Sequence, residues 1–260
     1  MTNNTNNTNN SDMQRYSVIN EKNPREIVLL RGSGCKWRRC RFCDYHLDFS
    51  KDENANSALN EEVLTKVTGR FGILEVINSG SFCDLNDYTM KKIRQICREK
   101  NIRQIHFECH WKDRSHIAAL RRFFSEIGTN VKVKIGVETF DYLFRESYLN
   151  KGIDEENPAA IAQDFNECCL LFGIPGQSTA AMQQDIETGL SHFERVCINI
   201  MVKNSAAILP DPRVRMSFIK ELMPLYINNP RVDILIENTD FGVGGECRES
   251  GCFGGEQNAK

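Results

Sequence analysis

Short apolar runs rich in β-branched residues recur along the chain, and polar segments with helical periodicity separate most of them. Runs of this length, bounded by polar or turn-forming residues, are typical of buried strands. The runs that predict strands are 27–30, 73–78, 102–108, 131–137, 167–172, 196–202 and 232–237.

The intervening segments predict helices, because their apolar residues recur at a spacing of three or four. In one of them, Met90, Ile93, Ile96 and Cys97 follow this spacing. The predicted helices are 60–71, 87–100, 116–127, 179–192 and 212–226.

Strand and helix alternate with a unit of roughly 30 residues, which indicates repeated βαβ units and a sheet of parallel strands. Parallel crossovers are right-handed, so six or seven such units curl into a barrel. The predicted fold is α/β: a partial or near-complete TIM-like (β/α)6–7 barrel in a single domain, residues 25–243. The Asn-rich segment 1–12 is expected to be disordered, and the Gly-rich segment 244–260 to be loop or disorder.

Composition narrows the class of protein. A formal net charge of -2 gives the whole surface no general attraction for nucleic acid. No apolar run is long enough to span a membrane, and the N-terminus lacks the apolar region of a secretory signal. Eleven cysteines, an odd number without such a signal, argue against a disulfide framework and favour the cytoplasm. Most are expected to be small buried hydrophobes: Cys83, Cys97, Cys109, Cys168, Cys169 and Cys197.

Three cysteines, Cys35, Cys40 and Cys43, lie within nine residues and directly follow the first apolar run. The gap between the first two predicted strands is longer than a usual βα connection, so it predicts a functional loop at the face where barrel active sites form. A [4Fe–4S] cluster takes four cysteines. A set of three would hold one face of the cluster and leave one iron open.

At this point the sequence resembles the radical S-adenosylmethionine (SAM) superfamily over about residues 25–240. The triad is Cys-x4-Cys-x-Phe42-Cys, one residue longer in its first spacing than the usual Cys-x3-Cys-x-aromatic-Cys. Further matching segments follow in the family's order along the strand–helix repeat. They are Asn78-Ser-Gly-Ser-Phe82, Phe107-Glu108, Gly136-Val-Glu138-Thr139, 148–152 and 172–177.

The resemblance implies two cofactors, a [4Fe–4S] cluster and SAM. It implies that Cys35, Cys40 and Cys43 bind the cluster. The residues expected to contact SAM are Phe42, Tyr45, Asn78, Ser79, Gly80, Ser81, Glu108, Arg114 and Glu138. The residues expected to face the substrate are His46, Asp48, Asn238, Asp240 and Phe241. No single catalytic residue is identified.

The cysteine loop together with Asn78-Ser-Gly-Ser-Phe82 is similar to a branch of the superfamily that works on 7-deazaguanine bases. This branch contains the queuine lyases of queuosine salvage and, more distantly, the radical SAM subunit of archaeosine synthase. The resemblance implies hydrogen abstraction from the cyclopentenediol of queuine and C–N cleavage that releases preQ1. It also implies an electron donor such as flavodoxin or ferredoxin. The compact chain favours a free base, and a tRNA-borne base is the alternative.

Other interpretations of the triad stay open at this stage. Its spacing also occurs in plant-type [2Fe–2S] ferredoxins, with Cys83 as a possible fourth ligand, which would make the protein an electron carrier. The long strand–helix repeat argues against such a small β-rich protein. A zinc site with His46 or another cysteine as fourth ligand and a metal-free thiol loop are further alternatives.

Four cations, Lys36, Arg38, Arg39 and Arg41, alternate with the cysteines. They could contact nucleic acid with Trp37 as a stacking face, or balance the charge of a thiolate-rich cluster and an anionic cofactor. The second interpretation is favoured because the basic run is short. Cys247 and Cys252 could help bind a second cluster, although two ligands are few for that role.

Overall fold

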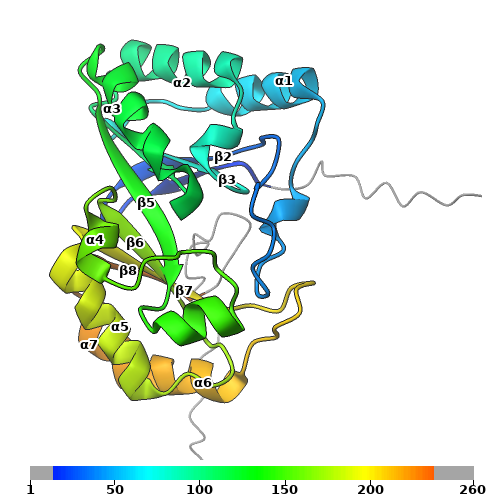
Figure 1. Cartoon of the computed structure of the whole chain (residues 1–260). Helices are drawn as coiled ribbons and strands as arrows, with labels where there is room; N and C mark the ends of the chain where they lie inside the picture. Colours follow the sequence, from blue (N-terminus) through cyan, green and yellow to red (C-terminus); the bar gives the residue numbers. More distant parts are fainter. Residues whose placement is uncertain (1–13, 237–260) are drawn as a thin grey trace, which may run out of the picture.

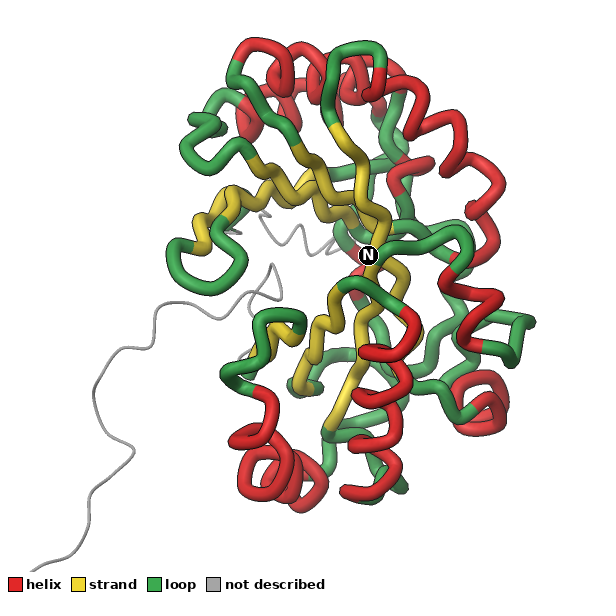
Figure 2. The backbone as a smooth tube through the Cα atoms, turned by 90° about the vertical axis from the view of Figure 1, so that its left-hand side faces the viewer, coloured by secondary structure: helices red, strands yellow, loops and turns green. Residues whose placement is uncertain are grey.

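The computed structural model describes residues 14–236, and its centre is one curled sheet of eight strands arranged in sequence order. β1 is antiparallel to β2, and every later pair of neighbours is parallel. Figure 2 shows the strands as an arc with helices along its outside. The strands are β1 (Tyr16–Ile19), β2 (Arg25–Leu30), β3 (Ile73–Asn78), β4 (Gln104–Glu108), β5 (Asn130–Glu138), β6 (Glu167–Phe172), β7 (Arg195–Ile200) and β8 (Val232–Leu235).

Helices connect the parallel strands and cover the outer face of the arc (Figure 1). Each follows a strand, as the right-handed βαβ rule requires. They are α1 (Glu53–Leu64), α2 (Asp87–Glu99), α3 (Ile117–Ser125), α4 (Pro158–Ala162), α5 (Thr179–His192), α6 (Pro212–Ser217) and α7 (Met223–Tyr226). Short 3-10 helices lie at Tyr45–Leu47, Phe82–Asp84 and Trp111–His116, and π-helical turns at Phe144–Tyr148 and Phe218–Leu222.

The alternation of side chains along each strand separates an apolar outer core from a mixed inner face. In β6, Cys168, Leu170 and Phe172 belong to the main apolar core. Cys168 also approaches Gly189 of α5, where a Cβ would lie 3.3 Å from its sulfur. Leu171, on the opposite face, belongs to a second apolar cluster beside the cysteine loop. The same strand therefore supports the helices with one face and the site with the other.

Buried charges fill the inner face of the sheet, mostly near the amino ends of its strands. Glu75 of β3 is paired with Arg25 of β2, Lys134 of β5 and Arg195 of β7. Although burial opposes its ionisation, these cations hold the pKa of the Glu75 carboxyl well below its usual range. Arg195 also pairs with Glu167 at 2.6 Å and Asp233 at 2.8 Å. Because each charge has an opposite partner, the network joins six strands without an isolated buried ion.

Among residues 14–236, side chains rather than a strand ladder join the two ends of the arc. Asn23, in the turn between β1 and β2, donates from its amide to Asp233 of β8 at 2.8 Å. Lys22 in the same turn donates to the Ile227 carbonyl at 3.0 Å and also to that of Val232. Ile19 and Leu235 pack on one small apolar cluster. The expected partial barrel of six or seven β/α units is confirmed.

Several element-level predictions were wrong. Strand β1 was not predicted, and it runs antiparallel in a sheet expected to be wholly parallel. The helix predicted over 60–71 is α1, which begins earlier because the Asp52 side chain accepts hydrogen bonds from the amides of Asn54 and Ala55. Helix α4, with Pro158 in its first turn, was missed because it is only one turn long. Segments 1–12 and 244–260 lie outside the described residues.

Candidate active site

The cysteine loop leaves the carboxyl end of β2 and is held by two segments that are distant in sequence. The Arg41 amide donates to the Leu149 carbonyl, and the Ile208 amide donates to the Arg41 carbonyl, both at 2.9 Å. Asn204 donates from its side chain to the Phe42 carbonyl at 2.9 Å. Backbone bonds on both sides of the loop therefore fix its position over the barrel end.

Trp37 anchors the first half of the loop. Its indole N–H donates to the Asn150 carbonyl at 2.8 Å, and its ring stacks on His110 with centroids 5.8 Å apart. A Cβ on Gly152 would lie 2.5 Å from two Trp37 ring carbons, and Gly152 has a φ of 78°. Only glycine fits this contact without a shift, since both the conformation and the space exclude a side chain.

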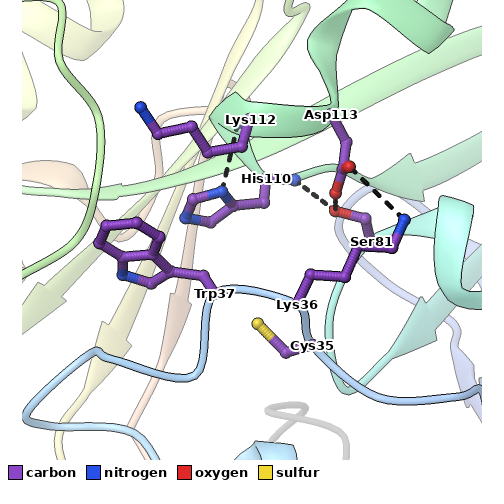
Figure 3. Close-up of a pocket in the computed structure, with 7 residues that line it drawn as sticks. All are labelled: Cys35, Lys36, Trp37, Ser81, His110, Lys112 and Asp113. Carbon is purple, nitrogen blue, oxygen red and sulfur yellow. Dashed lines mark hydrogen bonds and ion pairs between the residues drawn. The ribbon is translucent and has the colours of Figure 1, made fainter.

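The three thiols occupy different surroundings. Cys40 and Cys43 pack against an apolar cluster, whose buried members are Phe42, Leu149, Leu171, Ile174, Met201 and Ile208. Burial raises the pKa of the Cys40 thiol to about 12, and it also raises the pKa of Cys43. Cys35 instead lines a pocket of about 140 Å³ (Figure 3). The other residues that line this pocket are Lys36, Trp37, Ser81, His110, Lys112 and Asp113.

A buried cation lies beside Cys40 and Cys43. Lys151 lies with its ammonium 2.7 Å from Oε1 of Glu138, and both side chains are nearly inaccessible to solvent. Burial alone would lower the pKa of Lys151, but the Glu138 carboxylate and the two thiols raise it above its usual range. Its charge in turn lowers the pKa of both thiols and so favours their ligand form.

Glu138 is held in an uncommon conformation at the end of β5. Its φ is 69°, in the left-handed region, and the register between β5 and β6 shifts between Gly136 and Glu138. A Cβ on Gly136 would lie 2.6 Å from Oε1 of Glu138 and 2.9 Å from Nζ of Lys151. Strained non-glycine residues of this kind are concentrated at functional sites, where the surroundings enforce them.

The turn after β3 touches the cysteine loop directly. Asn78 donates from its side chain to the Ser81 carbonyl at 2.8 Å, and a Cβ on Gly80 would lie 2.9 Å from Cα of Cys35. The side-chain oxygen of Asn78, Oδ1, is buried and accepts no hydrogen bond from residues 14–236. An acceptor left unpaired in this way is costly unless a ligand supplies a donor. The α-amino group of SAM, which the resemblance places at this turn, would supply one.

The donor set fits an open-iron cluster better than a single metal ion. Within residues 14–236, no three His, Cys, Asp or Glu side chains converge as the ligands of one ion would. In a [4Fe–4S] cube each cysteine binds a different iron, so the three sulfurs need not converge on one point. Thiol ligands, a neighbouring buried cation and an apolar floor suit such a cluster.

The structure places the two alternative fourth ligands, Cys83 and His46, as follows. Cys83 packs against the main core, and burial raises its pKa to about 12. Asp113 and Asp84 are the charged groups that raise it further, and Cys109 is another neighbour. His46 lies on the 3-10 helix Tyr45–Leu47. Neither belongs, within the described residues, to a three-ligand group that could hold one ion, so the zinc interpretation gains no support here.

The structure places the other predicted site residues as follows. Phe42 forms part of the apolar floor, and the Lys151 ammonium lies 5.5 Å from its ring centroid. Tyr45 is exposed on the short helix that contains His46. Ser79 donates to the Asp48 carbonyl at 2.6 Å, which links the turn after β3 to the end of the cysteine loop.

Three predicted residues are engaged with other groups. Asp48 was expected to face the substrate, and its carboxylate forms a two-point ion pair with Arg15 at 2.8 and 3.1 Å. Arg114 lies over the Trp111 ring at 3.9 Å. Glu108 ends β4 with its carboxylate 3.2 Å from the Lys134 ammonium, and burial raises its pKa. Asn238, Asp240 and Phe241 lie outside the described residues.

The most informative residue that sequence reasoning left out of the site is Lys151. It belongs to the segment 148–152, which resembles the family, but no role had been given to it. Gly152 and Gly136 were likewise missed as the residues that leave room for Trp37 and for the Lys151–Glu138 pair. The Asn-Lys-Gly sequence, a turn with a cation inside it, was the available signal.

Comparisons with known proteins found similar sequences and folds. A solved structure of queuine lyase from Clostridium spiroforme, bound to SAM and queuine, is 42% identical, with a TM-score of 0.84. The alignment covers 90% of this chain and 100% of that one. The crystal structure of methylornithine synthase (PylB) has a TM-score of 0.55 at 15% identity, covers 80% of this chain and 63% of that one, and shares the fold.

Two further comparisons are less informative. An uncharacterized protein of Methanocaldococcus jannaschii is 25% identical over 162 residues, which are 54% of this chain and 43% of the relative. The chain therefore spans less than half the length of that curated relative. No protein-family profile matches the chain. In the part of the chain that the structure describes, no helix is long and apolar enough to cross a membrane.

Proposed function

Because the chain belongs to the radical SAM enzyme family that contains queuine lyase, we propose that it is itself a queuine lyase that acts on free queuine in the cytosol. The reaction would remove a hydrogen atom from the cyclopentenediol of queuine and cleave the C–N bond, releasing preQ1. The similarity to the queuine lyase structure, 42% identical over 90% of this chain, carries this proposal. The contact between the Gly80 turn and Cys35 supports it, because the turn would bind SAM and the loop would bind the cluster.

When bound, the [4Fe–4S] cluster supplies the electron that opens a C–S bond of SAM, which gives a radical able to remove hydrogen from an unactivated carbon. Cys35, Cys40 and Cys43 would hold three of its irons. The thiols must lose their protons to bind iron. Burial makes this step costly for Cys40 and Cys43, because it disfavours their thiolates. Lys151 reduces that cost through its charge and balances the negative charge of the ligands.

The turn after β3 would orient SAM. The unpaired Asn78 oxygen would accept from the α-amino group, and the Ser81 hydroxyl, 2.6 Å from Asp113, fixes the turn beside β4. The Glu138 and Glu108 side chains, at the ends of β5 and β4, would accept hydrogen bonds from other groups of SAM. The apolar cluster under Cys40 and Cys43 would keep water from the reacting atoms.

The remaining predicted residues belong to the substrate side of this proposal. His46 and Asp48 lie at the end of the cysteine loop. The Asp48 carbonyl accepts a hydrogen bond from Ser79, which belongs to the turn after β3. We assign base recognition to Asn238, Asp240 and Phe241, which follow β8, because substrate contacts collect at the carboxyl ends of barrel strands. Aspartate is a suitable acceptor for the N–H edge of a deazaguanine.

The test uses the protein reconstituted with iron and sulfide, incubated without air with queuine, SAM and a chemical reductant. We expect preQ1, methionine and 5′-deoxyadenosine by mass spectrometry, and no preQ1 with the Cys40→Ala variant. Cys97→Ala, a thiol in the main core, is the matched control and should retain the reaction. Cleavage of SAM without preQ1 would remove the lyase assignment. Release of the base only from queuosine-containing tRNA would replace the free substrate by the tRNA-borne one.

A further inference from the structure

The cysteine loop presents four cations to solvent in six residues: Lys36, Arg38, Arg39 and Arg41. We call these residues the basic loop. The whole chain has a formal net charge of -2, so this positive charge is a local feature. A concentrated patch of one sign attracts partners of the opposite sign and accelerates their encounter.

The three arginines of the basic loop keep their charge unneutralised. In the part of the chain between residues 14 and 236, no carboxylate lies within 4 Å of their guanidinium nitrogens. Elsewhere arginines pair closely, as Arg15 does with Asp48 at 2.8 Å. Lys36 has only long contacts, 3.8 Å to Asp84 and 3.7 Å to Asp113, and its side chain is 62% exposed.

Aromatic rings and carbonyl groups hold these guanidinium groups instead. They lie over the rings of Phe49, Trp37 and Tyr148, with centroid distances of 4.2, 5.1 and 5.7 Å for Arg38, Arg39 and Arg41 respectively. Such contacts orient a cation without cancelling its charge. An arginine already held in place loses less conformational freedom when a partner binds.

The basic loop is also the surface next to the thiols. Arg38 donates to the Cys35 carbonyl at 2.7 Å, and Lys36 lines the same small pocket as the Cys35 sulfur (Figure 3). Lys112, from the 3-10 helix after β4, also lines this pocket, but its ammonium pairs with Asp154 at 2.9 Å, so it is not counted in the basic loop. A donor seated on this loop is close to a cluster that the loop holds, and short distances matter because electron tunnelling weakens steeply with distance.

We propose that the basic loop is the docking surface for an acidic protein that carries single electrons. This inference rests on the proposed function, which requires the cluster to be reduced. In the docked complex one electron leaves the carrier and one electron enters the cluster. No bond forms or breaks and no proton moves in this chain.

The patch suits a small protein better than a nucleic acid. RNA and DNA binding draws on many phosphate contacts along a groove or extended face. The basic loop offers a compact group of cations confined to one turn of the chain. A free-base reaction gives the chain no need to hold RNA.

The test compares two triple charge reversals in the reconstituted enzyme. One carries Arg38→Glu, Arg39→Glu and Arg41→Glu. The control carries Lys91→Glu, Arg98→Glu and Lys100→Glu, which reverses as much charge on exposed positions of α2 and its C-terminal cap. Stopped-flow absorbance at low salt measures cluster reduction by reduced flavodoxin, an acidic carrier, and by the methyl viologen radical cation, a small molecule that needs no basic docking surface.

We expect the basic-loop variant to be reduced by flavodoxin at least about tenfold more slowly, and the control within about twofold of the unmodified enzyme. Reduction by methyl viologen should not slow in either. Flavodoxin binding, followed by titration calorimetry, should weaken in parallel and fall with added salt. If the triple variant loses its cluster, Arg39→Glu alone replaces it, because the Arg39 side chain makes no hydrogen bond to residues 14–236. We expect a smaller effect of the same sign.

An unchanged flavodoxin rate would overturn the docking proposal, as would an equal loss with both reductants in a variant that keeps its iron and sulfide. Loss of tRNA binding with normal flavodoxin reduction would identify the loop as an RNA surface instead. The lyase assignment is tested separately by queuine cleavage driven with methyl viologen. The docking proposal can therefore fail while preQ1 is still released, and preQ1 release can fail while flavodoxin still docks on the basic loop.

Discussion

Lys151 and Glu138 form a buried ion pair, 2.7 Å apart, in space that exists only because residue 136 is glycine. The pair joins the end of β5 to the segment that anchors the cysteine loop. It places a positive charge beside Cys40 and Cys43 and keeps a carboxylate at the barrel end. Three features of the site therefore depend on one contact between residues that are not adjacent in sequence.

Removing Lys151 should leave Glu138 buried without a partner. We expect Lys151→Met to lower the free energy of unfolding by about 3 kcal/mol, because an uncompensated buried charge is costly. Adding Glu138→Gln should restore part of the loss. Urea denaturation of the single and double variants measures this coupling. If the double variant lost as much free energy of unfolding as the two single variants together, the coupling would be contradicted.

Gly152 should tolerate alanine much less well than Gly128. Both have positive φ, 78° and 75°, but a Cβ at Gly128 has nothing within 4 Å, whereas one at Gly152 would meet Trp37 at 2.5 Å. We expect Gly128→Ala to cost about 1 kcal/mol for its conformation, and Gly152→Ala about 1–3 kcal/mol more for the collision. Equal losses in thermal or urea unfolding would show that Trp37 moves aside freely.

The buried network predicts a specific loss of stability in acid. The His106 and Arg195 side chains outweigh burial and lower the pKa of Glu167 to about 2. Its carboxylate therefore stabilises the fold above about pH 4.5, and this contribution, about 3 kcal/mol, disappears as the pH falls toward 2. Urea denaturation between pH 6 and 3 should show the decline, and it should be shallower in Glu167→Gln. A parallel decline in that variant would assign the acid sensitivity elsewhere.

His110 should remain neutral at physiological pH. Burial, reinforced by the charge of Lys151, lowers its pKa to about 4. Its Nε2 lies 2.9 Å from the Lys151 carbonyl and its Nδ1 3.3 Å from the Lys112 amide, so Nε2 donates and Nδ1 accepts. NMR of the metal-free protein should find this tautomer down to about pH 5. A ring that titrates near pH 6.5 would contradict the described packing against Trp37.

The cysteine triad should be separable from the other thiols by spectroscopy. Cys35→Ala, Cys40→Ala and Cys43→Ala should each abolish the visible absorbance and the low-temperature paramagnetic resonance signal of the reduced cluster. Cys83→Ala should retain both, because Cys83 packs on the main core. If Cys83→Ala also lost the signal, Cys83 would be a cluster ligand, and the two-iron carrier would become the better interpretation.

Local sequence was enough for the elements that have strong local signals. Helix α2 was predicted almost to the residue, because Asn86 caps its first turn and its apolar residues keep a regular spacing. Strand β1 was missed, since four residues carry too little pattern and its pairing depends on the hairpin with β2. Helix α1 was misplaced because its buried positions include the polar Asn56 and Asn60, which bond Arg31.

By itself the sequence determined the alternation of strands and helices, the partial barrel, and the cysteine triad with its family resemblance, because each depends on residues close together in the chain. Only the tertiary structure decided what surrounds the thiols. Lys151, Glu138 and Gly136 come together through strand register and loop packing. It also decided that the Gly80 turn lies against Cys35 and that the arginines of the basic loop have no carboxylate partner between residues 14 and 236. Distances between segments far apart in the chain are set by the packed fold, and no local spacing encodes them.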